Sequence, residues 1–211
     1  NINQMQWIET ALNGKYELGS NINASATSTW NSNGSGGYDG FNPIGDNTNN
    51  FNGTFDGLGF TISNLYINRP DTNFVGLFGF TNNATIKNIG LKDVDIIANI
   101  NVGGLFGYMI DGTIKNSYVS GTVIGIRNVG TLVGANDVGT ISNSYASGSV
   151  SGNEYAGGLV GFNTGTISNS YASGNVSGNE YAGGLVGFNT GRTISKSYAS
   201  GRESENEYEV G

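Results

Sequence analysis

The sequence predicts an all-β chain folded as a parallel β-helix, also called a β-solenoid. The first reason is a 26-residue stretch, YAGGLVGFNTGTISNSYASGNVSGNE, which occupies residues 155–180 and begins again at Tyr181. A period of roughly 20–50 residues is typical of stacked units that cannot bury a core alone. The second reason is composition, because short runs rich in Val, Ile, Thr, Tyr and Phe alternate with Gly, Asn and Ser. Sustained helical spacing is missing, apart from a weak hint over residues 5–12.

Equivalent apolar residues recur in successive units, and we expect them to stack in the core. The leucines that head each unit are Leu77, Leu105, Leu132, Leu159 and Leu185. The isoleucines that follow are Ile86, Ile114, Ile141, Ile167 and Ile194. A third series contains Val123, Val150 and Val176. The pattern predicts three short strands per coil of 26–27 residues and about six or seven coils, with each strand about 4.8 Å from its copy.

The residues between the predicted strands also recur periodically. Asn116, Asn143 and Asn169 share one register, which predicts a side-chain amide ladder at a bend. Glycines such as Gly174 are expected either to supply turn dihedrals forbidden to other residues or to let neighbouring backbone pass close by. Single-residue insertions at Asp137–Val138 and at Arg192 are expected to bulge outward as turns.

The two ends differ from the regular units. Residues 1–50 are interpreted as an N-terminal cap and a first irregular coil with a long loop, and residues 51–211 as the β-helix. The last coil, residues 192–211, is charged and is expected to cap the stack, since Glu203 stands where Val176 stood one coil earlier. It is either a natural end or an altered coil of a longer solenoid.

Composition excludes several classes of protein. A net charge of −7 with a pI near 4.4 argues against a nucleic-acid partner. The sequence contains no run of about 18 apolar residues, so we expect no membrane insertion. The chain has no Cys and no His, so it lacks thiol nucleophiles, the commonest general base and the commonest transition-metal ligand. The opening NINQMQWIET lacks the features of a signal peptide, so we expect a mature protein or an excised piece.

The repeated pattern GGLVGxNxGTIxNSYAxGxVxG resembles the GLUG motif of bacterial surface proteins. Upstream, GKYELGSNINASATSTWN, GFNPIG, FNGTFDGLGFTISNLYINRP and FVGLFG resemble filamentous-haemagglutinin-type adhesins of the two-partner secretion group. This resemblance covers about residues 13–210. It implies a right-handed β-helix and a role in adhesion or as a stalk. It also implies a secreted or cell-surface location in a bacterium, and a Gram-negative one in the case of two-partner secretion. It carries over no catalytic residues.

One candidate metal site is an acidic corner. Glu154, Glu180 and Glu207 recur at spacings of 26 and 27 residues, so they are expected to stack. Carboxylates about 5 Å apart repel, and calcium would relieve the repulsion. The alternative is a solvated acidic stripe without a metal, and it is the interpretation we favour.

The remaining candidates are a charged group, an aromatic pair and two hydroxyl ladders. Asp93 and Asp95, near Lys87 and Lys92, form a possible acid–base patch of a polysaccharide-active enzyme, although such a group is more often a solvated face. Trp30 and Tyr38 are candidates for glycan binding, unless they hold the N-terminal loop over the cap. The hydroxyl ladders would suit ice binding or only tight coil edges: Thr113, Thr140, Thr166, Thr193, and Ser120, Ser147, Ser173, Ser200.

The sequence therefore predicts a non-enzymatic segment of a bacterial adhesin that acts as a rigid stalk and display scaffold. The alternatives are a module that binds glycan or ice and a polysaccharide-active enzyme. The expected partner is a glycan or protein on a host or neighbouring cell. As a fragment, the chain is expected to be monomeric and to need no cofactor other than, at most, calcium.

Overall fold

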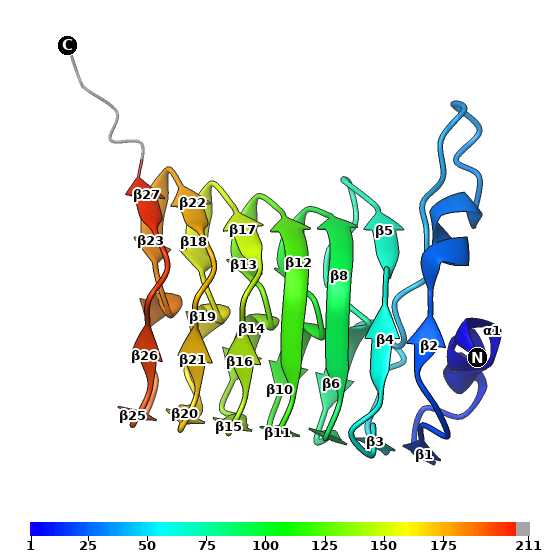
Figure 1. Cartoon of the computed structure of the whole chain (residues 1–211), viewed down its shortest axis with the longest axis horizontal. Helices are drawn as coiled ribbons and strands as arrows, with labels where there is room; N and C mark the ends of the chain where they lie inside the picture. Colours follow the sequence, from blue (N-terminus) through cyan, green and yellow to red (C-terminus); the bar gives the residue numbers. More distant parts are fainter. Residues whose placement is uncertain (206–211) are drawn as a thin grey trace.

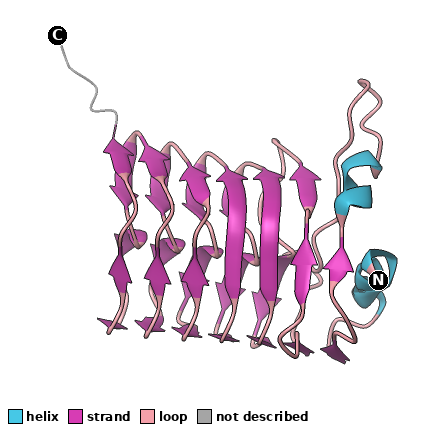
Figure 2. Cartoon of the chain, in the orientation of Figure 1, coloured by secondary structure: helices cyan, strands magenta, loops and turns pink. Residues whose placement is uncertain are grey.

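The computed structural model describes residues 1–205, which form one solenoid of parallel strands (Figure 1). Viewed from the N-terminal end, the chain turns clockwise as it recedes, so the helix is right-handed (Figure 1). Every strand-to-strand ladder in these residues is parallel, and Figure 2 shows strands in each turn with helices confined to the N-terminal end. The predicted parallel β-helix is confirmed. No helix in residues 1–205 is long and apolar enough to cross a membrane.

Within the described residues the strands form four sheets, numbered here in the order in which a coil visits them. Sheet 1 contains β1 (Lys15–Glu17), β3 (Thr54–Asp56), β7 (Thr85–Lys87), β11 (Thr113–Lys115), β15 (Thr140–Ser142), β20 (Thr166–Ser168) and β25 (Thr193–Ser195). Sheet 2 contains β2 (Ile22–Asn23), β4 (Thr61–Ser63), β5 (Tyr66–Asn68), β8 (Gly90–Ile97), β12 (Tyr118–Ile124), β16 (Tyr145–Ala146), β17 (Ser149–Ser151), β21 (Tyr171–Ala172), β22 (Val176–Gly178), β26 (Tyr198–Ala199) and β27 (Glu203–Glu205). Sheet 3 contains β9 (Ile100–Gly103), β13 (Arg127–Gly130), β18 (Glu154–Gly157) and β23 (Glu180–Gly183). Sheet 4 contains β6 (Phe78–Asn82), β10 (Phe106–Ile110), β14 (Val133–Asp137), β19 (Val160–Asn163) and β24 (Val186–Asn189).

The number of strands per coil differs from the three that were predicted. A regular coil such as residues 140–163 contains five, β15 to β19. The run AGGLVGF is not one strand, because the chain turns a corner at Gly158–Leu159 between β18 and β19. The run TISNSYAS is likewise divided, because Asn143 adopts a left-handed backbone conformation with φ 48°.

The predicted apolar ladders fill the core. Ile114 lies opposite Ile86 and Ile141, and Val150 lies opposite Val123 and Val176. The leucine series lies at the corner before sheet 4, where each coil donates a backbone hydrogen bond to the next, as in Leu132 N–H to Leu159 O at 3.0 Å. All these side chains are buried until the last coil, where Ile194 is 38% exposed. Burial of one apolar column per sheet is the main stabilising contribution, at roughly 25 cal/mol per Å².

Glycine and asparagine have different roles in the backbone of the coils. Gly174 does not adopt a positive φ; its backbone lies directly against the carbonyl oxygen of Gly148, so the close-approach role is confirmed. The left-handed corner positions fall instead to asparagine, which tolerates this conformation better than other residues with a Cβ. The predicted amide ladder through Asn116, Asn143 and Asn169 is not formed among the described residues; the amide bond at this corner joins Asn116 Nδ2 to Asn88 Oδ1, one coil earlier, at 3.0 Å.

Tyrosines form an outer column next to this corner. The Tyr145 ring stacks on Tyr118 at 4.8 Å and on Tyr171 at 4.9 Å, with interplanar angles of 4° and 1°. Tyr171 stacks on Tyr198 at 5.3 Å. Because the faces of the inner rings cover one another, only their edges are available to solvent.

The N-terminal end is closed by short helices. α1 (Ile2–Gln6) and the 3-10 helix η1 (Trp7–Thr10) lie across the end of the stack and bury Ile2, Met5 and Ile8 (Figure 1). The 3-10 helix η2 (Ser25–Thr29) begins the long loop that was predicted within residues 1–50.

In the last described coil, Glu203 occupies the register position of Val176, so a carboxylate ends this core column. Of the predicted charged coil 192–211, residues 206–211 lie outside the described residues. The two insertions are turns: Val138 is 38% exposed just after β14, and Arg192 is exposed just before β25.

Candidate functional site

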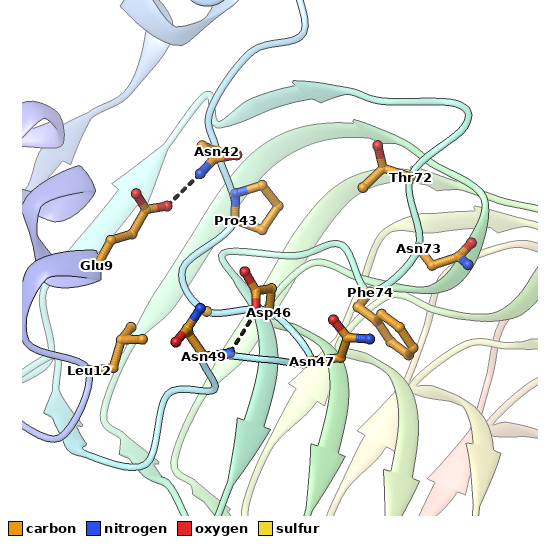
Figure 3. A pocket seen from close by; sticks show the side chains of 11 residues that line it. Glu9, Leu12, Asn42, Pro43, Asp46, Asn47, Asn49, Thr72, Asn73 and Phe74 are labelled. Atoms are coloured by element: carbon orange, nitrogen blue, oxygen red, sulfur yellow. Dashed lines mark hydrogen bonds between the residues drawn. The ribbon is translucent and has the colours of Figure 1, made fainter.

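A cleft of about 540 Å³ opens at the seam between the N-terminal cap and the second coil (Figure 3). Three separate segments line it: residues 9–12 of the cap, the loop 42–49, and the turn 72–74 between β5 and β6. Its volume lies within the roughly 300–1,000 Å³ that is usual for ligand pockets. Its size therefore makes it a candidate for a binding site.

The loop at the centre of the cleft is fixed by its own turn and by the second coil. Asp46 Oδ1 accepts hydrogen bonds from the backbone N–H groups of Thr48, at 2.8 Å, and Asn49, at 2.6 Å. Ile44 N–H donates to Leu77 O at 3.0 Å and anchors the start of the loop on the core. The second oxygen of Asp46 accepts no hydrogen bond from the described residues.

Glu9 joins the cap to this loop. Its Oε1 accepts hydrogen bonds from Gln6 Nε2 at 2.9 Å and from Asn42 Nδ2 at 2.5 Å (Figure 3). Burial raises the pKa of Glu9 above its ordinary value, against the opposing effects of the Asn42 hydrogen bond and the Arg69 charge. The carboxyl group is therefore partly desolvated at the cleft wall.

Phe74 forms the aromatic wall of the cleft and has an unusual backbone. Its φ is 61°, a left-handed conformation that costs a bulky residue about 1–2 kcal/mol. The equivalent residues of later coils also have a positive φ: Asn101, Asn128, Tyr155 and Tyr181. The Phe74 ring packs edge-on with Phe80 at 5.3 Å and Tyr108 at 5.8 Å, which holds it at the corner.

A second hollow adjoins the cleft, because Glu9 and Asn42 line both. Trp30 and Arg69 also line the second hollow. Trp30 is half-buried and stacks on Phe41 at 6.4 Å, so it packs the loop against the core as well as facing this hollow. Tyr38 is 40% exposed and lines neither hollow. Of the two predicted glycan-binding residues, Trp30 lines a hollow, and Tyr38 lies on the facing segment of the same hairpin, where it pairs with Ser32.

The acidic corner is only partly present in the described residues. Glu154 and Glu180 are register partners in sheet 3, whereas Glu207 lies outside the described residues. The position before Glu154 in this column is Arg127, whose Nε lies 3.2 Å from Glu154 Oε2. This guanidinium offsets the repulsion that motivated a calcium ion. In residues 1–205, no group of three or more Asp, Glu, His or Cys side chains is arranged to hold a metal.

The predicted acid–base patch is divided: Lys92, Asp93 and Asp95 share β8 of sheet 2, whereas Lys87 lies in sheet 1. Lys87 bonds Asp56, with Nζ 2.9 Å from Oδ2, and not Asp93 or Asp95. Asp93 and Asp95 line a shallow hollow beside Tyr66 that contains no lysine. The separation has a simple cause, because Lys87 ends a strand of sheet 1 whereas the aspartates lie in sheet 2.

The two hydroxyl ladders exist as predicted columns. Thr140 lies opposite Thr113 and Thr166, and the column extends backwards to Thr85 and Thr54. The outer serines are exposed or half-buried and lie two residues after the tyrosine column, as at Ser147. A more connected serine column was missed: Ser117, Ser144 and Ser170 are almost fully buried and link successive coils through their hydroxyls.

The cleft was also missed by the sequence analysis. Its walls come from residues more than 60 positions apart, and loop 42–49 carries no repeat signal that would place it beside residues 72–74. The only hint was the concentration of Asn and Asp in the run GDNTNNF.

Comparison with known proteins supports the repeat assignment. The family described as the GLUG motif matches residues 98–124, 152–177 and 178–203. Halomucin of Haloquadratum walsbyi is 43% identical over 99 residues, which are 44% of this chain but 1% of halomucin. A Gly-rich membrane protein of Evansella cellulosilytica is 45% identical over 53 residues, which are 25% of this chain and 6% of that protein.

Among solved structures, a candidate immunoglobulin A1 protease of Bacteroides ovatus has a similar fold. The TM-score is 0.60 at 17% identity, over 94% of this chain and 72% of that one. At this identity the likeness concerns the fold alone. The sequence matches and the coil geometry agree on one conclusion: the chain carries GLUG motif repeats built into a parallel β-solenoid.

Proposed function

We propose that this chain is a non-enzymatic segment of a secreted or cell-surface protein, in which the solenoid acts as a rigid stalk and display scaffold. The observation that carries the proposal is the continuity of the ladders. Sheets 1 and 2 run from the first described coil to the last, sheets 4 and 3 join them at β6 and β9, and buried apolar columns lie behind them. Such a wall has few places to bend, and its backbone N–H and C=O groups are paired from coil to coil.

The sequence relatives support a surface role within a longer protein. The chain corresponds to 1% and 6% of the two relatives, whose names denote a mucin-like protein and a membrane protein. A repeat that adds one coil per 26–27 residues suits such proteins, because length is gained without new packing problems. An adhesin of the two-partner secretion type, in a Gram-negative bacterium, remains a prediction that rests on the N-terminal resemblance.

A non-enzymatic role fits the chemistry of the described surface. The carboxylates proposed for a polysaccharide-active site lack a basic partner in their hollow. We therefore expect no cleavage of polysaccharides, and expect Asp93→Asn and Asp95→Asn variants to behave like the parent chain.

Surface display can be tested on intact cells of the source organism. Antibodies raised against the purified chain should label unpermeabilised cells, and brief external protease treatment should remove the label. Labelling that appears only after permeabilisation would overturn the proposal. A cytoplasmic protein of the same cells, probed in parallel, controls for leakage.

A further inference from the structure

We propose that the cleft between the cap and the second coil binds a neutral oligosaccharide. The cleft combines unpaired polar side chains and an aromatic wall, at a place where three chain segments meet (Figure 3). Saccharide binding here is independent of the stalk role, since the ladders do not require the cleft to be occupied.

The hydrogen-bonding groups of the cleft are suited to hydroxyl groups. The side chains of Asn47, Asn49 and Asn73 line the cleft and make no hydrogen bond with the described residues. Each amide offers two N–H donors and a carbonyl acceptor, which match a sugar hydroxyl that both donates and accepts. The second carboxylate oxygen of Asp46 adds a free acceptor between them.

The apolar part of the cleft is suited to the C–H face of a sugar ring. Phe74 and Pro43 line it, and the Phe74 ring is fixed by its edge-on contacts with Phe80 and Tyr108. The strained backbone of Phe74 is informative, because asparagine occupies the equivalent corner in the next two coils, at Asn101 and Asn128. An aromatic ring at this corner is therefore kept despite a conformation that favours asparagine.

Charge selects against anionic sugars. Glu9 and Asp46 are the ionisable residues that line the cleft. Arg69, in the adjoining hollow, lies 3.9 Å from the carboxylate of Asp39. Arg69 partly offsets the charge of Glu9, but the carboxylates of Glu9, Asp46 and Asp39 outnumber it, so a uronic acid or another anionic sugar would meet net negative charge, whereas a neutral sugar would not.

The shape suggests more than one sugar ring. The cleft and the hollow beside it each measure about 540 Å³ and share Glu9 and Asn42. Trp30 lines the adjoining hollow, so each of the two spaces has an aromatic residue in its lining, Phe74 in the cleft and Trp30 in the hollow. An oligosaccharide would use both, and a monosaccharide would bind more weakly.

The test is calorimetry of the full chain with cellohexaose, maltohexaose, mannohexaose and chitohexaose, and with hexagalacturonate as an anionic comparison. We expect at least one neutral oligosaccharide to bind and hexagalacturonate not to bind. Phe74→Asn should weaken that binding at least about tenfold, because it removes the ring while keeping a residue that accepts the corner conformation. Tyr155→Asn makes the same change at the same corner of a coil outside the cleft, and should leave the affinity unchanged.

A second variant protects the test against misfolding. Asn47→Ala combined with Asn73→Ala removes two exposed side chains without bonds to the described residues, and should also weaken binding. Failure of all four neutral oligosaccharides to bind, or equal affinity of the parent and both cleft variants, would overturn the proposal. Loss of binding in Tyr155→Asn alone would place the site elsewhere and would overturn it too. None of these outcomes affects the cell-labelling test of the stalk role.

Discussion

The backbone N–H of Ser144 donates a hydrogen bond to Oγ of Ser170 in the next coil, at 3.2 Å. The same contact joins Ser117 to Ser144 at 3.2 Å and Ser170 to Ser197 at 3.1 Å. Each hydroxyl then donates to the carbonyl two residues before it, as in Ser144 Oγ to Ser142 O at 2.8 Å. The corner that follows the left-handed asparagine is therefore closed by a continuous relay of serine hydroxyls.

Ser144→Ala should destabilise the chain. It removes the acceptor of the Ser117 N–H group at a position where Ser117 and Ser144 are each only 1% exposed. A buried N–H without a partner costs about 1–3 kcal/mol, so the free energy of unfolding should fall by that amount in denaturant titrations. Ser147→Ala, in the same coil, changes an exposed hydroxyl and should stay within about 0.5 kcal/mol of the parent. Equal losses for the two variants would contradict the relay.

Gly174→Ala should destabilise the chain more strongly. A Cβ at this position would overlap the carbonyl oxygen and carbon of Gly148 in the preceding coil, so the coils would have to separate. Backbone displacement of this kind costs about 1–3 kcal/mol or more. The melting temperature measured by circular dichroism should therefore fall clearly.

Gly19→Ala is the matched control for this glycine. Nothing lies within 4 Å of a Cβ at Gly19, and its φ is not positive. Alanine should therefore be neutral or slightly stabilising there, because it restricts the unfolded chain. If the two alanine variants melted together, close approach of the coils would not be the reason for glycine at position 174.

Acid should weaken the contact between the second and third coils. Burial of Asp56 alone would raise its pKa, but hydrogen bonds from Lys87, Asn88 and the Leu58 N–H outweigh burial and lower it below the ordinary 3.8. A lowered folded-state pKa gives stability that is fully present above the unfolded-state value and is lost as the pH falls through the folded-state value. Stability should thus drop at pH values below 3.8.

The size of this acid effect is limited by solvent, because the Lys87 side chain is 42% exposed. We expect a loss on the order of 1 kcal/mol, read from urea titrations at a series of pH values. Asp56→Asn should be less stable at neutral pH and should show a flatter dependence on pH below 3.8. A variant with the same acid slope as the parent would exclude Asp56 as its source.

The core could be predicted because its signal is repeated. Five isoleucines at nearly constant spacing leave one register that places all of them on one face, and the structure adopts that register. Asn143 and Ser144 recur with the same period. The period does not tell which of the two residues adopts the left-handed conformation at the corner and which one forms hydrogen bonds between coils. The structure assigns the turn to asparagine and the pairing to serine.

Features without a period could not be predicted in the same way. The position of Glu9 beside Asn42 depends on how the cap lies across the first coils, which no repeat determines. Lys87 was grouped with Asp93 because they are near in sequence, yet a corner of the coil separates them and Lys87 bonds Asp56. In a solenoid, residues about one coil apart are the neighbours, and those a few positions apart often lie on different sheets.

Removal of one whole repeat should leave the solenoid intact. Deletion of residues 155–180 joins Glu154 to Tyr181 and restores the sequence NEYAGGLVG, because the two copies are identical there. Each remaining strand then finds an equivalent partner: Ile194 would stack on Ile141 as Ile167 does now. Since repeat stability is approximately a sum of coil and interface terms, the shortened chain should fold cooperatively with a modestly lower melting temperature.

The contrast is a deletion that breaks the period. Removal of residues 155–167 takes out 13 residues, half of a 26-residue repeat, so the strands that follow would arrive on the wrong sheets. Their apolar columns would no longer continue those of the preceding coils, and the C-terminal coils should unfold, with loss of the β signal in circular dichroism and rapid proteolysis. The shorter deletion should therefore be the more damaging one. If the 26-residue deletion were equally disruptive, the coils would not be the independent stacking units that a stalk of this kind requires.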